Sequence, residues 1–380
     1  MDSLVIEPPP VFGGVFRGAT VVVTGHMGFK GGWLSLWLRH LGAVVHGYSL
    51  KVPSTPGIFT LARIGEVVGH HVGDVRDLDR LRGLLSSTRP RFLFHLAAQP
   101  IVSRSYADPL ETFSSNAIGT ATVLEALRTA DWPCAAVIVT SDKCYQNSEW
   151  PWGYRETDQL GGSDPYSASK AAAELVTHAY LRSFFAPDRQ PVRIATARAG
   201  NVIGGGDFGA DRIVADCVVA WSQSLPVRLR SPKATRPWQH VLEPLSGYLA
   251  LARALTSPTA PHGEAFNFGP APGPGRQVVE LIEALSRHWQ LPPGVAPFEV
   301  IEAIPFREAR LLTLACDKAH EVLHWRPTLT FEECVAMTGV WYRDVLHAGA
   351  DARTATETQI GQYESLADAR GLPWCKEITA

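Results

Sequence analysis

Ala19-Thr-Val-Val-Val-Thr24 runs directly into Gly25-His-Met-Gly28-Phe-Lys-Gly31, and this stretch decides the fold. Its β-branched residues are typical of a parallel strand that is buried on both faces. The glycines let the chain turn sharply into a helix whose apolar residues include Leu34, Leu38 and Leu41. Backbone N–H groups at the start of such a helix can bind a pyrophosphate. The pattern therefore predicts the first unit of a dinucleotide-binding fold.

Further β-type runs alternate with helical patterns as far as residue 200. We expect strands over 43–48, 67–74, 91–100, 135–140 and 192–198, and helices over 77–85, about 109–128 and from 166 onward. This alternation predicts an α/β protein with a doubly wound parallel sheet of the Rossmann type.

After residue 200 the chain changes to loops and then to helices. The segments 200–207 and 235–240 read as loops, 256–276 reads as loops around 265–268, and the segments 278–289 and 317–323 read as helices. Consecutive prolines near the N-terminus cannot join a central strand. We therefore expect an arm outside the main fold over 1–17, a dinucleotide-binding domain over 18–200, and a tail over 351–380. Between them, 201–350 forms a smaller mixed α/β substrate lobe, with some chain returning to the first domain.

The composition is that of an ordinary globular protein. It is 46% apolar and 19% charged, with a net charge of −2, which gives no electrostatic reason to expect a nucleic-acid or membrane partner. The cysteines at 134, 144, 217, 316, 334 and 375 form no C-x-x-C pair and no cluster with histidine at metal-ligand spacing. We expect reduced thiols, no metal, and a soluble cytoplasmic protein, because no signal peptide or membrane-spanning run is found.

The second expected strand leaves the choice of dinucleotide open. It ends in Ser49-Leu-Lys51, where NAD enzymes usually carry an acid for the adenosine ribose. Lys51 could meet a 2′-phosphate or simply be solvated. Asp74 could lie at the adenine or cap the helix over 77–85. The small side chains of Ala97 and Ala98 would let a cofactor approach the fourth strand.

The central strand and the helix after it carry the candidate chemistry. The strand over 135–140 ends in Ser141-Asp142-Lys143, and Tyr166-Ser-Ala-Ser-Lys170 opens the helix. A tyrosine and a lysine four residues apart share one helix face. The ammonium should hold down the pKa of the phenol, which would then exchange a proton near neutral pH, as the oxidation of an alcohol requires.

Taken together, these motifs resemble the extended short-chain dehydrogenase/reductase superfamily. Within it, the chain resembles the CDP-glucose 4,6-dehydratases over roughly 17–345. The matching stretches are 24–34, 95–100, 140–145, 149–156, 164–170, 200–207 and 236–244. Ser141-Asp-Lys143 and Trp152-Gly-Tyr-Arg-Glu156 are the specific parts, because the glycine turn and the Tyr/Lys pair belong to the whole superfamily.

The resemblance implies a lyase of deoxysugar biosynthesis that converts CDP-glucose to CDP-4-keto-6-deoxyglucose by internal hydride transfer from carbon 4 to carbon 6. Tyr166 would take the proton of the carbon-4 hydroxyl, and Ser141 would hydrogen-bond the reacting oxygen. Lys143 would remove the carbon-5 proton, and Asp142 would protonate the departing carbon-6 hydroxyl. Lys170 would lower the tyrosine pKa and hold the cofactor ribose.

The resemblance also implies the binding residues. The cofactor, NAD with NADP not excluded, would be bound by Gly25, His26, Gly28, Phe29, Gly31, Asp74, Ala97, Ala98, Tyr166 and Lys170. The substrate would be bound by Asn201, Arg212, Arg236 and His240, with Asn201 and Arg236 at the pyrophosphate. Arg212 and His240 could instead pair with a local carboxylate or cap a helix. A homodimer or homotetramer is also implied.

Three other interpretations stay open. Related dTDP-sugar dehydratases carry Glu at the position of Lys143, which could also be a plain surface lysine. The chain could be a different nucleotide-sugar 4,6-dehydratase or a 4-epimerase, although an epimerase has no use for the Asp142-Lys143 pair. A dinucleotide-sensing module without catalysis is the third possibility, against which the intact Ser141, Tyr166 and Lys170 argue.

Overall fold

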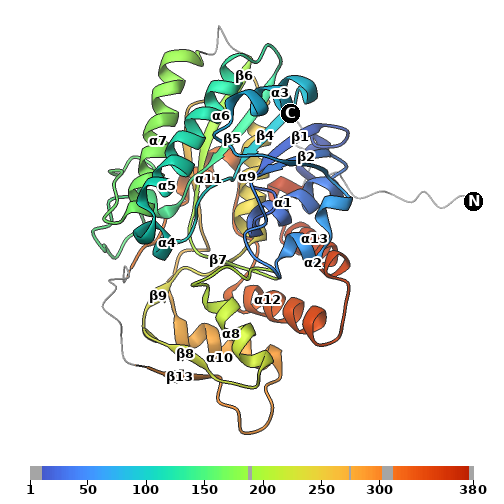
Figure 1. Ribbon diagram of the computed structural model, residues 1–380, viewed down its shortest axis with the longest axis vertical. Coiled ribbons are helices and arrows are strands. Elements are labelled where there is room, and N and C mark those ends of the chain that lie inside the picture. Colours follow the sequence, from blue (N-terminus) through green and yellow to red (C-terminus); the bar gives the residue numbers. More distant parts are fainter. Residues whose placement is uncertain (1–10, 187–190, 274, 302–310, 376–380) are drawn as a thin grey trace, which may run out of the picture.

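A seven-stranded parallel sheet forms the centre of the computed structural model, which describes residues 11–186, 191–273, 275–301 and 311–375 (Figure 1). Its strands are β1 Thr20–Thr24, β2 Val44–Ser49, β3 Gly69–Val72, β4 Phe92–His95, β5 Cys134–Val139, β6 Val192–Ala199 and β11 Ala265–Phe268. Their order is β11-β6-β5-β4-β1-β2-β3. Successive strands are added to one side of β1 as far as β3 and to its other side from β4 onward, so the strand order reverses between β1 and β4. Ligands bind at such a switch point, beyond the carboxyl ends of the strands.

Helices cover both faces of this sheet. Those around it are α1 Phe29–His40, α3 Leu78–Thr88, α5 Pro109–Phe113, α6 Gly119–Arg128, α7 Pro165–Phe184, α9 Leu242–Ala254, α11 Asp317–Leu323 and α13 Ala352–Ala369. One core cluster joins α3 and α6 to the sheet, and a larger one joins α1, α9 and α13 to its other face. The predicted doubly wound α/β fold is confirmed.

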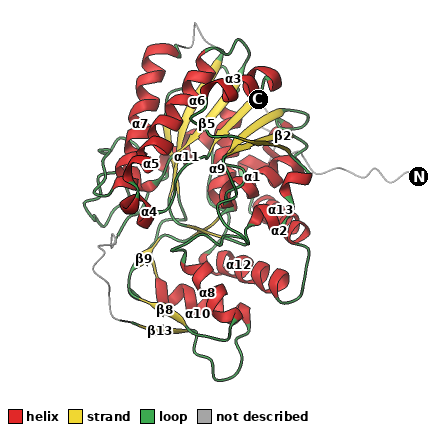
Figure 2. Cartoon of the chain, in the orientation of Figure 1, coloured by secondary structure: helices red, strands yellow, loops and turns green. Residues whose placement is uncertain are grey.

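The lower lobe in Figure 2 is smaller and mixed in structure. Its helices are α8 Ile213–Ser222, α10 Val278–Trp289 and α12 Phe331–Leu346, and its strands are β7 Val202–Ile203, β8 Val227–Leu229, β9 Thr235–Arg236, β10 Gln239–His240, β12 Arg276–Gln277 and β13 Phe298–Val300. These strands pair as β7 with β10, β8 with β13 and β9 with β12. The segments predicted as loops over 200–207 and 235–240 thus contain short strands.

Shorter elements complete the chain. They are α2 Ile58–Leu61, α4 Val102–Ala107, the π-helical turn η3 Ser114–Ile118, and the 3-10 turns η1 Val11–Gly14, η2 Ile64–Glu66, η4 Asp142–Cys144 and η5 Pro373–Cys375. The π turn interrupts the helix predicted over 109–128. The segment 265–268, around which loops are predicted, is the edge strand β11, and it pairs in parallel with β6.

Both ends of the described chain pack against α1. The ring of Phe12 stacks on Trp374 with 5.1 Å between centroids, and Trp37 of α1 lies edge-on to both. Phe12 and Phe16 are almost completely buried. Residues 11–17 therefore do not lie outside the main fold as expected, because burying two aromatic rings gains more than leaving them in water. The consecutive prolines themselves lie outside the described residues.

All six cysteines are unpaired and buried. Over the part of the chain that the structure describes, no helix is long and apolar enough to cross a membrane. Within those same ranges, no group of three or more His, Cys, Asp or Glu side chains is arranged to hold a metal ion.

Candidate active site

The turn after β5 gathers three of the predicted catalytic residues. β5 is buried along its whole length and delivers Ser141 as the cap of η4. The Ser141 hydroxyl accepts a hydrogen bond from the Lys143 backbone N–H over 3.2 Å and donates one to Asp142 Oδ1 over 3.0 Å. Ser141 and Asp142 are buried, and Lys143 is half-buried. The turn therefore presents a hydroxyl, a carboxyl and an amine at the carboxyl end of the central strand.

Tyr166 and Lys170 lie in the first turns of α7. Asp164 caps this helix by accepting from the Ser167 backbone N–H over 2.9 Å, and Pro165 occupies its first position. Both Tyr166 and Lys170 are more than nine-tenths buried. The Lys170 ammonium lies 3.5 Å from the carbonyl oxygen of Val139, the last residue of β5. Helix α7 thus brings the tyrosine and the lysine to the catalytic turn.

The electrostatics of this pair differ from the prediction. Burial raises the pKa of Tyr166 to about 12, against a hydrogen bond with Ser141 and the charge of Arg212, which lower it. Burial also lowers the pKa of Lys170 to about 8. The prediction that Lys170 holds the phenol near neutral pH is wrong for these side chains, because desolvation outweighs the charges around the ring.

The burial of Asp142 favours the protonated form of its carboxyl. Burial raises the pKa of this carboxyl, although Lys143, the Ser141 hydroxyl and Lys30 all lower it. A protonated carboxyl can donate its proton to a departing hydroxyl.

The glycine turn after β1 fits a dinucleotide. Gly25 has a φ of +78°, and a Cβ there would lie 2.7 Å from the Ala97 backbone nitrogen. A Cβ on Gly31 would overlap the Gly25 carbonyl oxygen, so neither position accepts a larger residue. Gly28 is the N-cap of α1, and no side chain caps this helix. Its first backbone N–H groups can therefore bind a pyrophosphate at the switch point of the sheet.

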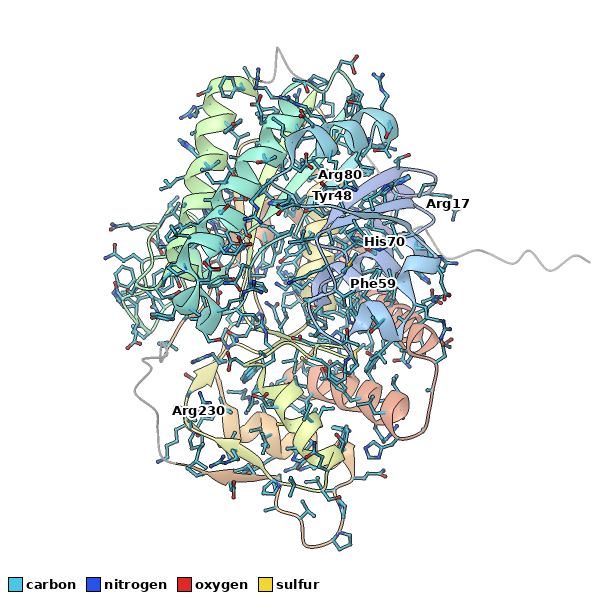
Figure 3. All side chains as sticks on the ribbon, viewed as in Figure 1. Arg17, Tyr48, Phe59, His70, Arg80 and Arg230 are labelled. Carbon is cyan, nitrogen blue, oxygen red and sulfur yellow. The ribbon has the colours of Figure 1, made fainter. Side chains whose placement is uncertain are left out.

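Ser49 and His26 occupy the region where an acid usually binds the ribose. The Ser49 hydroxyl accepts from the Met27 backbone N–H over 3.3 Å and shares a hydrogen bond of 2.9 Å with His26 Nδ1. His26 Nε2 lies 2.8 Å from Nδ1 of His70, which Figure 3 places beside Phe59. Burial lowers the pKa of His26 to about 4. A neutral His26 thus shares a hydrogen bond with Ser49. Lys51, two residues further along the chain, is exposed.

Asp74 lies just beyond β3 and is held by Arg76. The Asp74 carboxylate accepts from Arg76 Nε over 2.9 Å and from Nη2 over 2.6 Å. These hydrogen bonds lower the pKa of Asp74. The cap of α3 is Asp77, which accepts from the Arg80 backbone N–H. The alternative in which Asp74 caps the helix over 77–85 is therefore wrong.

Three predicted substrate residues line the second lobe. The guanidinium of Arg212, at the start of α8, lies 3.9 Å from Asp207, and its charge acts on Tyr166. Asn201 and Arg236 are half-buried. A Cβ on Gly200, the residue before Asn201, would lie 3.0 Å from Asp142 Oδ2. Arg212 and the segment at Asn201 therefore lie close to the catalytic turn.

His240 is placed differently from the prediction. It is completely buried, its ring is edge-on to Trp33 with centroids 5.5 Å apart, and Nδ1 accepts from the Leu242 backbone N–H over 3.3 Å. Burial lowers its pKa to about 3. The structure thus places His240 in the core, at the end of β10 and two residues before α9 begins.

Comparison with known proteins shows the family of this chain. Residues 22–254 match the family model described as GDP-mannose 4,6 dehydratase. The CDP-glucose 4,6-dehydratase of Salmonella typhimurium is 41% identical over 354 residues, covering 92% of this chain and 97% of that protein. The chain belongs to the nucleotide-sugar 4,6-dehydratase family. A dTDP-glucose 4,6-dehydratase of Xanthomonas campestris pv. campestris is 27% identical, covering 85% of this chain and 93% of that protein.

Solved structures show the same fold. An epimerase of Methanothermobacter thermautotrophicus superposes with a TM-score of 0.76 at 22% identity, over 88% of this chain and 95% of that one. A dTDP-glucose 4,6-dehydratase of Streptomyces venezuelae, solved with NAD bound, superposes with a TM-score of 0.72 at 22% identity, over 86% and 97%.

Lys30 is a residue near the site that the sequence analysis does not predict. Its ammonium lies 3.4 Å from the hydroxyl of Tyr248 on α9, and the charge of Asp142 acts on it. Burial lowers the pKa of Lys30 to about 8. The signal was a lysine inside an otherwise apolar glycine turn, which is an unusual place for a solvated charge.

Proposed function

We propose that the protein converts CDP-glucose to CDP-4-keto-6-deoxyglucose with NAD as its cofactor. The observation that carries this proposal is the Ser141-Asp142-Lys143 turn, which lies against Tyr166 with a buried acid whose pKa is raised. The 41% identity to a CDP-glucose 4,6-dehydratase supports cytosine as the nucleobase of the substrate.

In the proposed reaction, Tyr166 acts as the phenolate, which the Ser141 hydrogen bond and the charge of Arg212 favour, and takes the proton of the carbon-4 hydroxyl. Ser141 hydrogen-bonds the same oxygen. The ketone formed at carbon 4 acidifies the carbon-5 proton, which Lys143 removes. Asp142 protonates the carbon-6 hydroxyl as it leaves as water. Bound NAD supplies the acceptor that keeps the hydride between its departure from carbon 4 and its return to carbon 6. Proton transfers then reset the side chains.

Two groups of residues bind the cofactor and the substrate in this proposal. Gly25, His26, Gly28, Phe29 and Gly31 bind the cofactor pyrophosphate, and Asp74, Ala97 and Ala98 border its adenosine half. Lys170 holds the ribose beside the nicotinamide. Arg212, Arg236 and Asn201 bind the pyrophosphate of the sugar nucleotide, since a guanidinium fork matches phosphate oxygens. The boundary between the two binding domains lies near residue 200.

The assembly and location are part of the proposal. Leu110 on α5, Ile118 on η3 and Leu175 on α7 are exposed apolar side chains, which favours a homodimer or homotetramer over a monomer. We place the protein in the cytoplasm, in deoxysugar biosynthesis. Light scattering at micromolar concentration would measure the assembly, and a mass of one chain would contradict it.

The decisive test is incubation with CDP-glucose and NAD in deuterated water, followed by mass spectrometry. The expected product has lost one water and carries one deuterium at carbon 5. A sugar inverted at carbon 4 would instead identify an epimerase. Dehydration of another nucleotide sugar but not of CDP-glucose would identify that sugar as the substrate. Parallel reactions with NADP would decide the cofactor. Cofactor binding without turnover of any sugar nucleotide would favour the sensing module.

A further inference from the structure

Glu174 is a buried carboxylate that the proposed chemistry does not use. It lies four residues after Lys170 on α7, and therefore on the same face of the helix. Only 4% of its side chain is exposed. Its oxygens accept hydrogen bonds from Thr140 Oγ1 over 2.5 Å and from Thr196 Oγ1 over 3.0 Å. Glu174 thus ties α7 to the carboxyl ends of β5 and β6.

Arg198 at the end of β6 completes the binding of this carboxylate. Its Nε lies 2.8 Å from Oε1 and its Nη2 lies 2.9 Å from Oε2 of Glu174. The third nitrogen, Nη1, donates to the hydroxyl of Tyr145 over 2.8 Å and to the carbonyl oxygen of Glu156 over 3.1 Å. Tyr145 in turn donates to Asn267 Oδ1 over 2.8 Å. The two-pronged geometry is the strongest form of a guanidinium–carboxylate pair.

The pair holds both ends of the catalytic turn. Thr140, bound by Glu174, is the residue before Ser141, and Tyr145, bound by Arg198, is the residue after Cys144. The carboxylate is also on the helix that carries Tyr166 and Lys170. A buried ion pair adds little stability compared with apolar residues of the same size. Its geometry therefore points to positioning rather than to stability.

We propose that Glu174 and Arg198 are positioning residues, whose bidentate pair sets the Ser141–Lys143 turn against Tyr166 and Lys170 on α7. This inference rests on the proposed reaction, because it concerns the same catalytic set. The distance between the Ser141–Lys143 turn and α7 then depends on the Glu174 carboxylate.

The charge of Glu174 also acts on Lys170. Burial lowers the pKa of Lys170, and Cys144 and Glu174 raise it. The other groups coupled to Lys170 are His95, which is buried and neutral, and Lys30 on α1. Removing the charge of Glu174 should therefore make Lys170 lose its proton at a lower pH. A residue with only a structural role would not produce this shift.

The test is Glu174→Gln, which keeps the size of the side chain and removes its charge. We expect kcat to fall roughly 10- to 100-fold through misplacement of the reacting groups, with a much smaller change in KM. The alkaline limb of the kcat–pH profile should move to lower pH. The matched control is Glu243→Gln, at a carboxylate that is 1% exposed and accepts from the Thr328 and Leu329 backbone N–H groups. It should change thermal stability and leave the alkaline limb in place.

A double variant separates positioning from stability. Arg198→Met alone leaves Glu174 as an uncompensated buried charge and should unfold at a lower temperature. Adding Glu174→Gln should restore much of that stability without restoring kcat. Recovery of kcat together with stability would overturn the positioning role, as would an E174Q profile with an unmoved alkaline limb.

Crystal structures of the wild type and E174Q give a readout that does not need turnover. The turn over 141–145 should move relative to Tyr166 by more than about 0.5 Å, the tolerance of catalytic geometry. An unmoved turn would overturn the positioning role whatever the substrate proves to be. A wild-type protein that turns over no nucleotide sugar would instead overturn only the proposed function.

Discussion

Ser141 contacts both Asp142, the proposed acid, and Tyr166, the proposed base at the carbon-4 hydroxyl. The Ser141 hydroxyl lies 3.0 Å from Asp142 Oδ1, and a hydrogen bond between Ser141 and the Tyr166 phenol lowers the phenol's pKa. One hydroxyl therefore contacts the groups that act at carbon 6 and at carbon 4. Ser141→Ala should lower kcat by about 10- to 1000-fold, the cost of removing one donor at a developing oxyanion. Ser87→Ala, which removes a hydroxyl that donates only to its own helix, is the control. Equal kcat values in the two variants would contradict this prediction.

Substituting Asp142 and Lys143 should separate the steps of elimination. Asp142→Asn cannot protonate the leaving hydroxyl, so substrate recovered from deuterated water should carry deuterium at carbon 5 while loss of water falls at least about 100-fold. Lys143→Met should abolish both the exchange and the elimination. Lys318→Met, at a surface lysine paired with Glu264 over 2.8 Å, is the control. Exchange that persists in Lys143→Met would assign the base elsewhere.

The glycine turn offers a test of cofactor binding. Gly31→Ala places a methyl group on the Gly25 carbonyl oxygen, which must distort the turn that holds the pyrophosphate. NAD affinity, measured by calorimetry, should fall more than about tenfold. Gly83→Ala lies on α3, where an added Cβ meets nothing within 4 Å, and should be neutral or slightly stabilising. A Gly31→Ala protein with unchanged affinity would argue against this binding mode.

Arg212 should act on both the substrate and the phenol. Its charge lowers the pKa of Tyr166, so Arg212→Gln should raise that pKa, leave less phenolate at a given pH and lower kcat at neutral pH. Losing a guanidinium–phosphate contact should also raise KM by about 10- to 100-fold. The control Arg228→Gln removes an exposed arginine whose Nε lies 3.3 Å from Glu299. The prediction is wrong if both variants give the same KM.

Buried histidines should make the protein sensitive to acid. Burial lowers the pKa of His26 to about 4 and those of His95 and His240 to about 3, from 6.5 in an exposed ring. Below pH 6.5 the unfolded chain therefore binds more protons than the folded one. The free energy of unfolding should fall as pH drops towards 3, by up to about 1.4 kcal/mol per pH unit for each ring.

Urea unfolding at pH 7 and pH 5 measures this slope, and His240→Gln should reduce it. Glu243 acts in the opposite sense, because burial raises its pKa to about 7 and the folded state then binds the extra proton. Glu243→Gln should therefore steepen the loss of stability in acid. A slope that neither variant changes would assign the acid sensitivity to other groups.

The sequence predicted those features that depend on local pattern. The strands and helices over 20–24, 134–139, 278–289 and 317–323 follow from periodicity, and the glycine turn follows from backbone geometry. Strand β11 was missed because prolines and glycines surround it on both sides. The pKa of Tyr166 was wrong because burial depends on segments far apart in the chain. Nothing local pairs Glu174 with Arg198, since the two charges lie 24 residues apart, one on a helix and one on a strand.

The stacking of Phe12 on Trp374 has a consequence for the connectivity of the molecule. The first and last described turns, η1 and η5, are neighbours, so in a chain trimmed to 11–375 a short linker could join residue 375 to residue 11, with new ends opened in the exposed turn around Gly294. Such a circular permutant should keep the fold. A fragment trimmed to the matched residues 22–254 should not, because it would leave Trp37 without Phe12, Tyr363 and Trp374 around it.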